Sequence, residues 1–379
     1  MTGQARSGGG TRSSRRPRLI TETIFFPAAA LYGGLALPVS VHGMLGGQWA
    51  PPGLVSPTGH AHEMFFGYAL AVVTGFLVNR LGAIGLTLLL GLWLAARIAF
   101  LFAPGSAAAL GTNIAFALAV ALTAAPRFMK AAKKSRNRVI GPLVIALCTA
   151  GVAFQLVAPA GGSPARYAVL ATAVVLFAML MLFFGGRLIA PAAAGAIEKT
   201  GGMLTARVQP RIEGAILLAM AAATALTLLP GLRPGAGAML VIAGILALVR
   251  LARWRLWRAR GRMDLYCLGV GYAWLGTGLV LLGAARGFDF GLSPAAATHA
   301  ITVGALGTLT TNVMARTRLL RLRIDPASKA SWLAFVTAAM STAAVARVLA
   351  PHDVGSLAVA ATAWLLATFT LLGLLMRYR

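Results

Sequence analysis

The chain has 379 residues, of which 59% are hydrophobic and only 11% are charged. Its mean hydropathy is +0.81. A soluble domain of average composition is about 45–50% apolar and about 25% charged, so this chain lacks the charge to cover a water-facing surface. Most soluble enzymes are therefore excluded. An integral membrane protein has no such requirement, because its lipid-facing surface can be as apolar as its interior.

The net charge is +26, and the pI is about 11.9. Such a charge is typical of nucleic-acid-binding proteins, but here the Lys and Arg residues form short clusters between long apolar runs. This arrangement indicates membrane topology, so we expect a lipid bilayer as the partner and no nucleic acid. Cys148 and Cys267 lie inside apolar runs, and these two thiols provide neither a disulfide framework nor a Cys-based zinc site.

Residues 1–20 are mainly Gly, Ser, Thr and Arg, a composition that predicts a disordered basic tail. The remainder, 21–379, predicts a single all-α transmembrane domain. A helix that crosses the hydrocarbon layer of ~30 Å needs roughly 20 apolar residues, and windows of that length predict about twelve spans. We expect the longest internal loop at 187–211. The predicted spans are 22–45, 57–78, 81–103, 107–125, 139–158, 167–186, 212–231, 235–252, 264–285, 294–315, 330–350 and 355–376.

With twelve spans, successive loops lie on alternate sides of the membrane, and 29 of the 34 Lys and Arg residues fall on one side. Cytoplasmic loops are enriched in Lys and Arg, so the charge distribution predicts that both termini are cytoplasmic. The five basic residues of the other side are Arg97, Arg166, Arg233, Arg286 and Arg347.

The chain contains five histidines, and on this topology all of them lie at or near the non-cytoplasmic face. Two of them occupy similar positions, because His62 and His299 each lie six residues after the Ser of a Ser-Pro pair. Ser at the N-cap and Pro at the first helical position are typical of a helix start. We therefore expect both imidazoles at equal depth, where they face each other if their helices are neighbours. The similarity extends to Gly67 and Gly304, and to Thr74 and Thr311.

Two imidazoles that face each other across a helical bundle suit the axial positions of haem iron, or half of a copper site. Alternatively, His62 and His299 are interfacial side chains or partners in interhelical hydrogen bonds. His60 lies two residues before His62, so a regular helix places it on another face. It is expected at the rim of the site, or as a ligand to another group.

Glu63 is an acid at membrane depth, and such residues are candidates for function. It could pair with Arg97 near the outer end of the next span, or accept a hydrogen bond from a ligating histidine. Arg97 in turn could meet an anionic group such as a haem propionate, or extend to the membrane interface. The sequence leaves these alternatives open.

Several segments resemble conserved blocks of the NnrS family. The most specific is 59–69, Gly-His-Ala-His-Glu-Met-Phe-Phe-Gly-Tyr-Ala, and the run 299–308, His-Ala-Ile-Thr-Val-Gly-Ala-Leu-Gly-Thr, is similar to a second block. Three more segments are similar to further blocks of the family: Val-Met-Ala-Arg at 313–316, Gly-Gly-Arg at 185–187 and Gly-Tyr-Ala-Trp at 271–274. These segments extend across nearly the whole chain.

The resemblance implies a multi-pass protein of the bacterial inner membrane, with twelve helices, that carries haem and copper. It also implies a role in the nitric oxide response and in tolerance of nitrosative stress. By likeness, His60, His62, Glu63 and His299 become the best candidates for the site, with His60, His62 and His299 as metal ligands. The family's biochemical activity is not defined, so the resemblance does not decide whether the chain is an enzyme.

Two other functions compete with a haem protein. A secondary transporter without a metal cofactor also suits twelve helices. A haem–copper oxidase or nitric oxide reductase core takes six His ligands with two of them adjacent, and five His without an adjacent pair cannot supply that set. The electron donor, the substrate and the oligomeric state are not indicated by the sequence.

Overall fold

The computed structural model describes residues 18–131, 139–157, 164–229, 231–288, 291–349 and 352–378. The predicted tail, 1–20, lies outside these residues except for its last three. These form β1 (Arg18–Ile20), which pairs with β2 (Arg80–Gly82) in an antiparallel ladder. Apart from this short sheet, the regular structure of the described residues is helical, which confirms the predicted all-α membrane bundle.

Nine helices in the described part of the chain are long and apolar enough to cross a membrane. A tenth, α6 (Ile140–Leu156), is apolar but shorter. Short 3₁₀ turns lie at Pro52–Leu54, Leu256–Arg258 and Pro326–Lys329. The nine are α1 (Glu22–Met44), α4 (Ala83–Phe102), α5 (Ala107–Ala131), α7 (Pro164–Glu198), α8 (Pro210–Thr227), α9 (Arg233–Arg253), α10 (Met263–Gly287), α13 (Ala330–Leu349) and α14 (Val354–Arg377).

Two further helices contain a π-helical segment. In the first, α2 (Pro57–His62) continues through π-helix Glu63–Ala69 into α3 (Leu70–Leu77). In the second, α11 (Pro294–His299) continues through π-helix Ala300–Gly307 into α12 (Thr308–Arg321). We call them the first and second composite helices. Their starts confirm the predicted caps, because the Ser56 and Ser293 hydroxyls each accept a backbone N–H three residues later, at 3.1 Å.

Both π-helical segments begin directly after a histidine, His62 in the first composite helix and His299 in the second. A glycine in each segment allows a large side chain to pack closely. A Cβ at Gly67 would lie 2.8 Å from the Arg97 guanidinium, and a Cβ at Gly304 would lie 2.6 Å from the Trp274 ring. Single π-helical turns are often found at functional sites, so a functional site is expected beside these segments.

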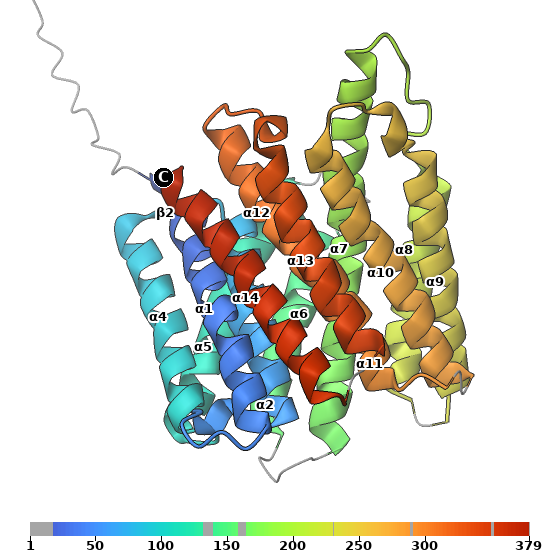
Figure 1. Cartoon of the computed structure of the whole chain (residues 1–379). Coiled ribbons are helices and arrows are strands. Elements are labelled where there is room, and N and C mark those ends of the chain that lie inside the picture. The colour runs from blue at the N-terminus through green and yellow to red at the C-terminus, as the bar shows by residue number, and fades with distance from the viewer. Residues whose placement is uncertain are drawn as a thin grey trace, which may run out of the picture.

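The predicted loop 187–211 is wrong in its first part, because α7 continues to Glu198 and only 199–209 lies between helices. The sequence suggested a loop because this stretch contains Pro191, several glycines and charges of both signs. The proline removes one backbone donor, but the Ala-rich run around it favours helix. This run is also packed, with Ile189, Ala193 and Ile197 buried. In Figure 1 the upper end of α7 extends past the other helix ends around it.

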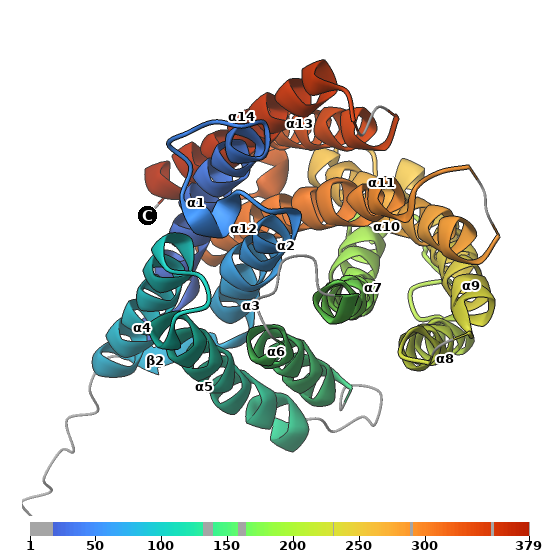
Figure 2. The ribbon, with the colours of Figure 1, turned by 90° about the horizontal axis from the view of Figure 1, so that it is seen from below.

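The composite helices and α7 lie between two peripheral groups of helices (Figure 2). One group is α4, α5 and α6, and the other is α8, α9 and α10, while α1, α13 and α14 lie along a third side (Figure 1). The composite helices contact each other through α3 and α12, their C-terminal portions. Their N-terminal portions instead line a common cavity, which holds the candidate site.

Candidate functional site

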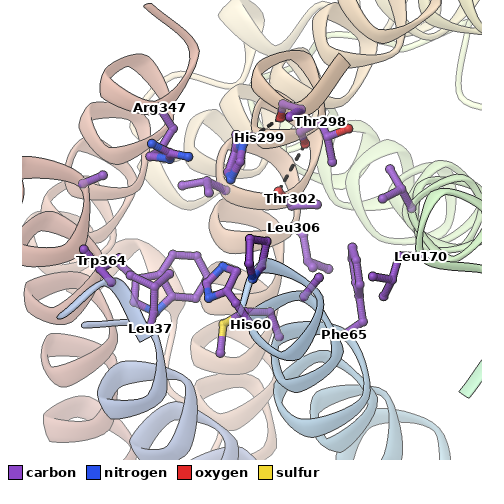
Figure 3. Close-up of a pocket in the computed structure, with 18 of the residues that line it drawn as sticks. Leu37, His60, Phe65, Leu170, Thr298, His299, Thr302, Leu306, Arg347 and Trp364 are labelled. Atoms are coloured by element: carbon purple, nitrogen blue, oxygen red, sulfur yellow. Dashed lines mark hydrogen bonds between the residues drawn. The ribbon is translucent and has the colours of Figure 1, made fainter. Parts of the chain in front are cut away.

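A cavity of about 510 Å³ lies between the N-terminal portions of the two composite helices (Figure 3). Residues of α1, α7, α10, α13 and α14 complete its wall, and most of them are apolar. Its volume falls within the range of roughly 300–1,000 Å³ that ligand sites usually have. The ionisable side chains of its wall that can be cationic are His60, His299, Arg286 and Arg347.

The hydrogen bonds of His60 determine which of its nitrogens carries the proton. Its Nδ1 lies 3.1 Å from the hydroxyl of Ser40 on α1. That hydroxyl donates its own proton to the carbonyl of Leu54 at 2.8 Å, so Ser40 can only accept from His60. The neutral imidazole therefore carries its proton on Nδ1, and Nε2 has the lone pair.

His299 has the same tautomer for a different reason. Its Nδ1 lies 2.7 Å from the carbonyl oxygen of Ala295, one turn earlier in the same helix. A carbonyl oxygen cannot donate, so Nδ1 is the donor and Nε2 again has the lone pair. Histidines that bind a metal usually donate their other ring N–H in this way, which fixes the tautomer and the ring orientation.

Two arginines that the sequence places on the non-cytoplasmic side also line this cavity, Arg286 from α10 and Arg347 from α13. In Figure 3 the guanidinium of Arg347 lies beside the His299 imidazole. Nη1 of Arg286 is buried and has no hydrogen-bond partner among the described residues. The two guanidinium groups bring positive charge to the cavity wall, and such charge favours an anionic group on a ligand. These arginines were not among the predicted site residues.

His62 does not line this cavity. It is fully buried, with its ring stacked 3.9 Å from the Phe100 ring and 4.7 Å from the Phe154 ring. Its Nδ1 lies 2.8 Å from Glu63 and its Nε2 lies 2.7 Å from the Gln155 amide nitrogen. Both ring nitrogens are thus engaged. The expectation that His62 faces His299 is wrong, because it is His60 that shares the cavity with His299.

Glu63 and Arg97 form a buried ion pair, with Nη1 of Arg97 2.6 Å from Oε1 of Glu63. The Tyr32 hydroxyl donates to the other carboxylate oxygen, and Nη2 of Arg97 donates to Asn113. The pairing of Glu63 with Arg97 is thus confirmed, and so is its contact with a histidine, His62. Arg97 is 2% exposed, so it does not extend to the interface.

We call this set of hydrogen-bonded side chains the Glu63 network. It connects α1, the first composite helix, α4, α5 and α6. Each charge has a partner, as a buried ion pair requires. The side chains in the network are Tyr32, His62, Glu63, Arg97, Asn113 and Gln155. The network fixes the first composite helix against its neighbours, and His60 belongs to that helix. We therefore regard the network as the support of the cavity wall on the His60 side.

Within the described ranges, no three or more His, Cys, Asp or Glu side chains come close enough together to hold a metal ion. His60, His62 and His299, which the sequence predicts as metal ligands, are therefore not one three-ligand site. The structure instead provides two histidines in one cavity and a third within the Glu63 network.

The comparison with known families agrees with the resemblance seen in the sequence. The model of the NnrS family, described as NnrS protein, matches residues 23–378. The chain belongs to the NnrS family. No curated protein sequence matches it.

Two of the NnrS-like blocks meet at a second buried cluster, away from the cavity. A Cβ at Gly185 would lie 2.4 Å from the Tyr272 ring, and one at Gly186 would lie 2.1 Å from the Arg250 guanidinium. Arg250 and Arg187 approach Glu213 at 3.5 Å and 2.8 Å. The two glycines of the Gly-Gly-Arg block are therefore explained by the side chains packed on them.

Proposed function

We propose that this NnrS-family membrane protein binds haem in the cavity between its composite helices, on the non-cytoplasmic side of a bacterial inner membrane. The proposal includes a role in the nitric oxide response and in tolerance of nitrosative stress, as the family resemblance implies. The observation that carries it is the matched state of His60 and His299. Each donates from Nδ1 and has the Nε2 lone pair, in one cavity large enough for a cofactor.

The proposed topology is twelve spans with both termini in the cytoplasm. The nine long apolar helices found in the described residues, α6 and the two composite helices together make twelve. The positions of Lys and Arg support this orientation, since 29 of 34 then lie on the cytoplasmic side. In this orientation the cavity lies towards the outer face, because His60 and His299 are near the outer starts of their helices.

The residues of the cavity suit haem. His60 and His299 would hold the iron through Nε2, and Arg286 and Arg347 would bind the propionates. When bound, haem iron supplies a site for diatomic ligands and for one-electron transfer. The chain itself orients the two imidazoles through Ser40 and the Ala295 carbonyl, and its apolar wall limits the access of water.

Copper does not suit the described residues in the same way. Protein copper sites are built from several His, Cys or Met ligands. In the ranges that the structure covers, no three His, Cys, Asp or Glu side chains lie close enough together to hold a metal ion, and of these residue types His60 and His299 line the cavity. His62 already uses both of its nitrogens within the Glu63 network. The proposal is therefore limited to haem.

The test is the absorption spectrum of the purified protein and its haem content by the pyridine haemochrome assay. We expect a Soret band in the wild type, and its loss or a large shift in His60→Ala and in His299→Ala. His42→Ala is the matched control. Because His42 is outside the cavity wall, this substitution should leave the spectrum unchanged. The proposal would be refuted if the wild-type protein contained no haem as purified and also bound none when haem was added to it.

A secondary transporter remains a second candidate, and one observation favours it. Transporters bind substrates near helices whose regular hydrogen bonding is interrupted, and both composite helices are π-helical beside the cavity. Saturable flux of a solute into vesicles that contain the reconstituted protein, abolished by a cavity substitution, would support transport. Haem binding without such flux would exclude it as the main function.

A further inference from the structure

A second, smaller cavity of about 90 Å³ lies between the first composite helix, α7, α10 and the second composite helix. Its wall includes Phe76, Phe177, Leu188, Leu309 and Val313. Among the described residues that line it, only Thr310 carries a hydroxyl. None of the residues that line it is exposed. The cavity is therefore an apolar, partly open space between helices, lined by buried and half-buried side chains.

The boundary between the two cavities is thin. Leu306 lines both of them. Tyr68, in the wall of the first cavity, lies 2.7 Å from the hydroxyl of Thr310, in the wall of the second. The Thr310 hydroxyl donates to the carbonyl of Leu306 at 2.6 Å, so it accepts its hydrogen bond from Tyr68. The Leu306 side chain and the hydrogen bond between Tyr68 and Thr310 are thus part of the boundary between the two cavities.

An aromatic contact completes this boundary. The Phe65 ring of the first cavity stacks on the Phe177 ring of the second, with centroids 5.5 Å apart and an interplanar angle of 17°. Leu306 lies in the π-helical segment of the second composite helix, and Phe65 in that of the first. The boundary is therefore formed where both helices depart from regular α-helical bonding.

The wall chemistry restricts what the second cavity can hold. An ordered buried water needs about 2–4 polar partners, whereas the Thr310 hydroxyl already donates to Leu306 and accepts from Tyr68. An ion would lose its hydration without compensation. The volume is too small for a cofactor or a sugar, but a diatomic molecule or a noble-gas atom fits it. Apolar cavities lined by aliphatic and aromatic side chains are known to bind xenon, and the wall of this cavity is of that kind.

We propose that the second cavity is a binding site for small uncharged gas molecules. Such molecules dissolve in the hydrocarbon interior of the membrane, so a gas site within the bundle is supplied from the lipid phase. Its position also places the gas one side chain from the cavity of His60 and His299. The binding of gas does not depend on the proposed function. Only the further step, in which the bound gas reaches haem, rests on it.

Xenon is the probe for the binding claim, because it needs no haem in the protein. Wild-type protein in nanodiscs should show saturable xenon binding by ¹²⁹Xe NMR, beyond that of empty nanodiscs. Val313→Trp should abolish it by filling the cavity from a half-buried position. Leu218→Trp on α8 is the control, since Leu218 is 74% exposed and distant from the wall of the cavity. Leu309→Phe provides a second, milder filling variant.

Equal xenon binding in wild type and in both filling variants would overturn the proposal, as would wild-type binding no greater than that of empty nanodiscs. A lipid acyl chain seen in the cavity in an experimental map would also overturn it. If the protein holds haem, Val313→Trp should slow carbon monoxide rebinding severalfold after photolysis with an unchanged Soret band. A protein without haem that still binds xenon would refute the proposed function and leave the gas site standing.

Discussion

His60 and His299 line one cavity from two different helices, and each donates its Nδ1 proton to an acceptor that belongs to the protein. For His60 this acceptor is a side-chain hydroxyl of Ser40, on α1, and for His299 it is a carbonyl of its own helix. The two imidazoles thus have the same tautomer through unrelated contacts. Only the acceptor of His60 can be removed by substitution, which separates the orientation of the ring from its presence.

Ser40→Ala should weaken haem binding although every proposed ligand remains. Loss of such an outer hydrogen-bond partner typically lowers metal affinity by about 10- to 100-fold. The measurement is a haem titration of the haem-free protein, followed by the Soret absorbance. Ser341→Ala is the control, because Ser341 also accepts a ring N–H, from Trp274 at 3.1 Å, outside the cavity wall. Equal affinities in the two variants would contradict the role of Ser40.

Arg286 and Arg347 should make the cavity selective for the free propionates of haem. The wild type should bind haem more tightly than haem dimethyl ester, whose propionates are uncharged, because each guanidinium pairs with a carboxylate. Arg286→Gln and Arg347→Gln should reduce this difference, and the two titrations measure it directly. Arg233→Gln is the control, since Arg233 is exposed and is not in the cavity wall. If the variants keep the full preference for free propionates, the arginines have another role.

Gly67 is predicted to be essential for the packing of the Glu63 network. In Gly67→Ala the new Cβ would lie 2.8 Å from both the Arg97 guanidinium and the Tyr32 ring. Overpacking of this kind costs about 1–3 kcal/mol, so the melting temperature in detergent should fall. Gly111→Ala is the control in α5, where the Cβ meets nothing within 4 Å. That change should leave the stability unchanged or raise it by about 0.5–1 kcal/mol. Equal melting temperatures for the two variants would contradict this account.

The sequence predicted where the two helices start, but it did not predict which histidine faces the cavity. Ser56-Pro57 and Ser293-Pro294 are local signals, and both helices begin where these signals place them. The direction of a side chain around the helix axis depends on which neighbours pack on each face. His62 faces α4 and α6 through Phe100 and Phe154, and that packing leaves the cavity to His60.

The arginines of the site could have been found from the charge count. Only five basic residues lie on the predicted outer side, and this scarcity is itself a signal, because positive charge is disfavoured there. Arg286 and Arg347 line the cavity, and Arg97 pairs with Glu63. By contrast, no sequence signal marks Tyr32, Asn113 and Gln155, since only the tertiary packing creates the contacts that place them in the Glu63 network.

The proposed orientation predicts the location of the C-terminus and of the loop before α14. Green fluorescent protein fused after the last residue should fluoresce, because it folds in the cytoplasm. Alkaline phosphatase fused at His352 should be active, because it folds only after export. The same two reporters, exchanged between the sites, should both be inactive and serve as the control. An active phosphatase at the C-terminus would invert the topology and place the His60 cavity on the cytoplasmic side.

The Glu63–Arg97 pair should be more important for stability than its charge alone suggests. Arg97→Met leaves the fully buried Glu63 carboxylate without its cation, and breaking a buried pair in this way costs about 3–5 kcal/mol. Glu63→Gln added to Arg97→Met should recover part of the loss, because the amide is uncharged and can still accept from Tyr32. Arg127→Met on α5 is the control, because its guanidinium donates to the Arg80 carbonyl from an exposed position. Thermal unfolding of the four variants, including Glu63→Gln alone, gives the order of their stabilities. If the double variant is no more stable than Arg97→Met, the loss comes from packing of the arginine side chain and not from the unpaired carboxylate.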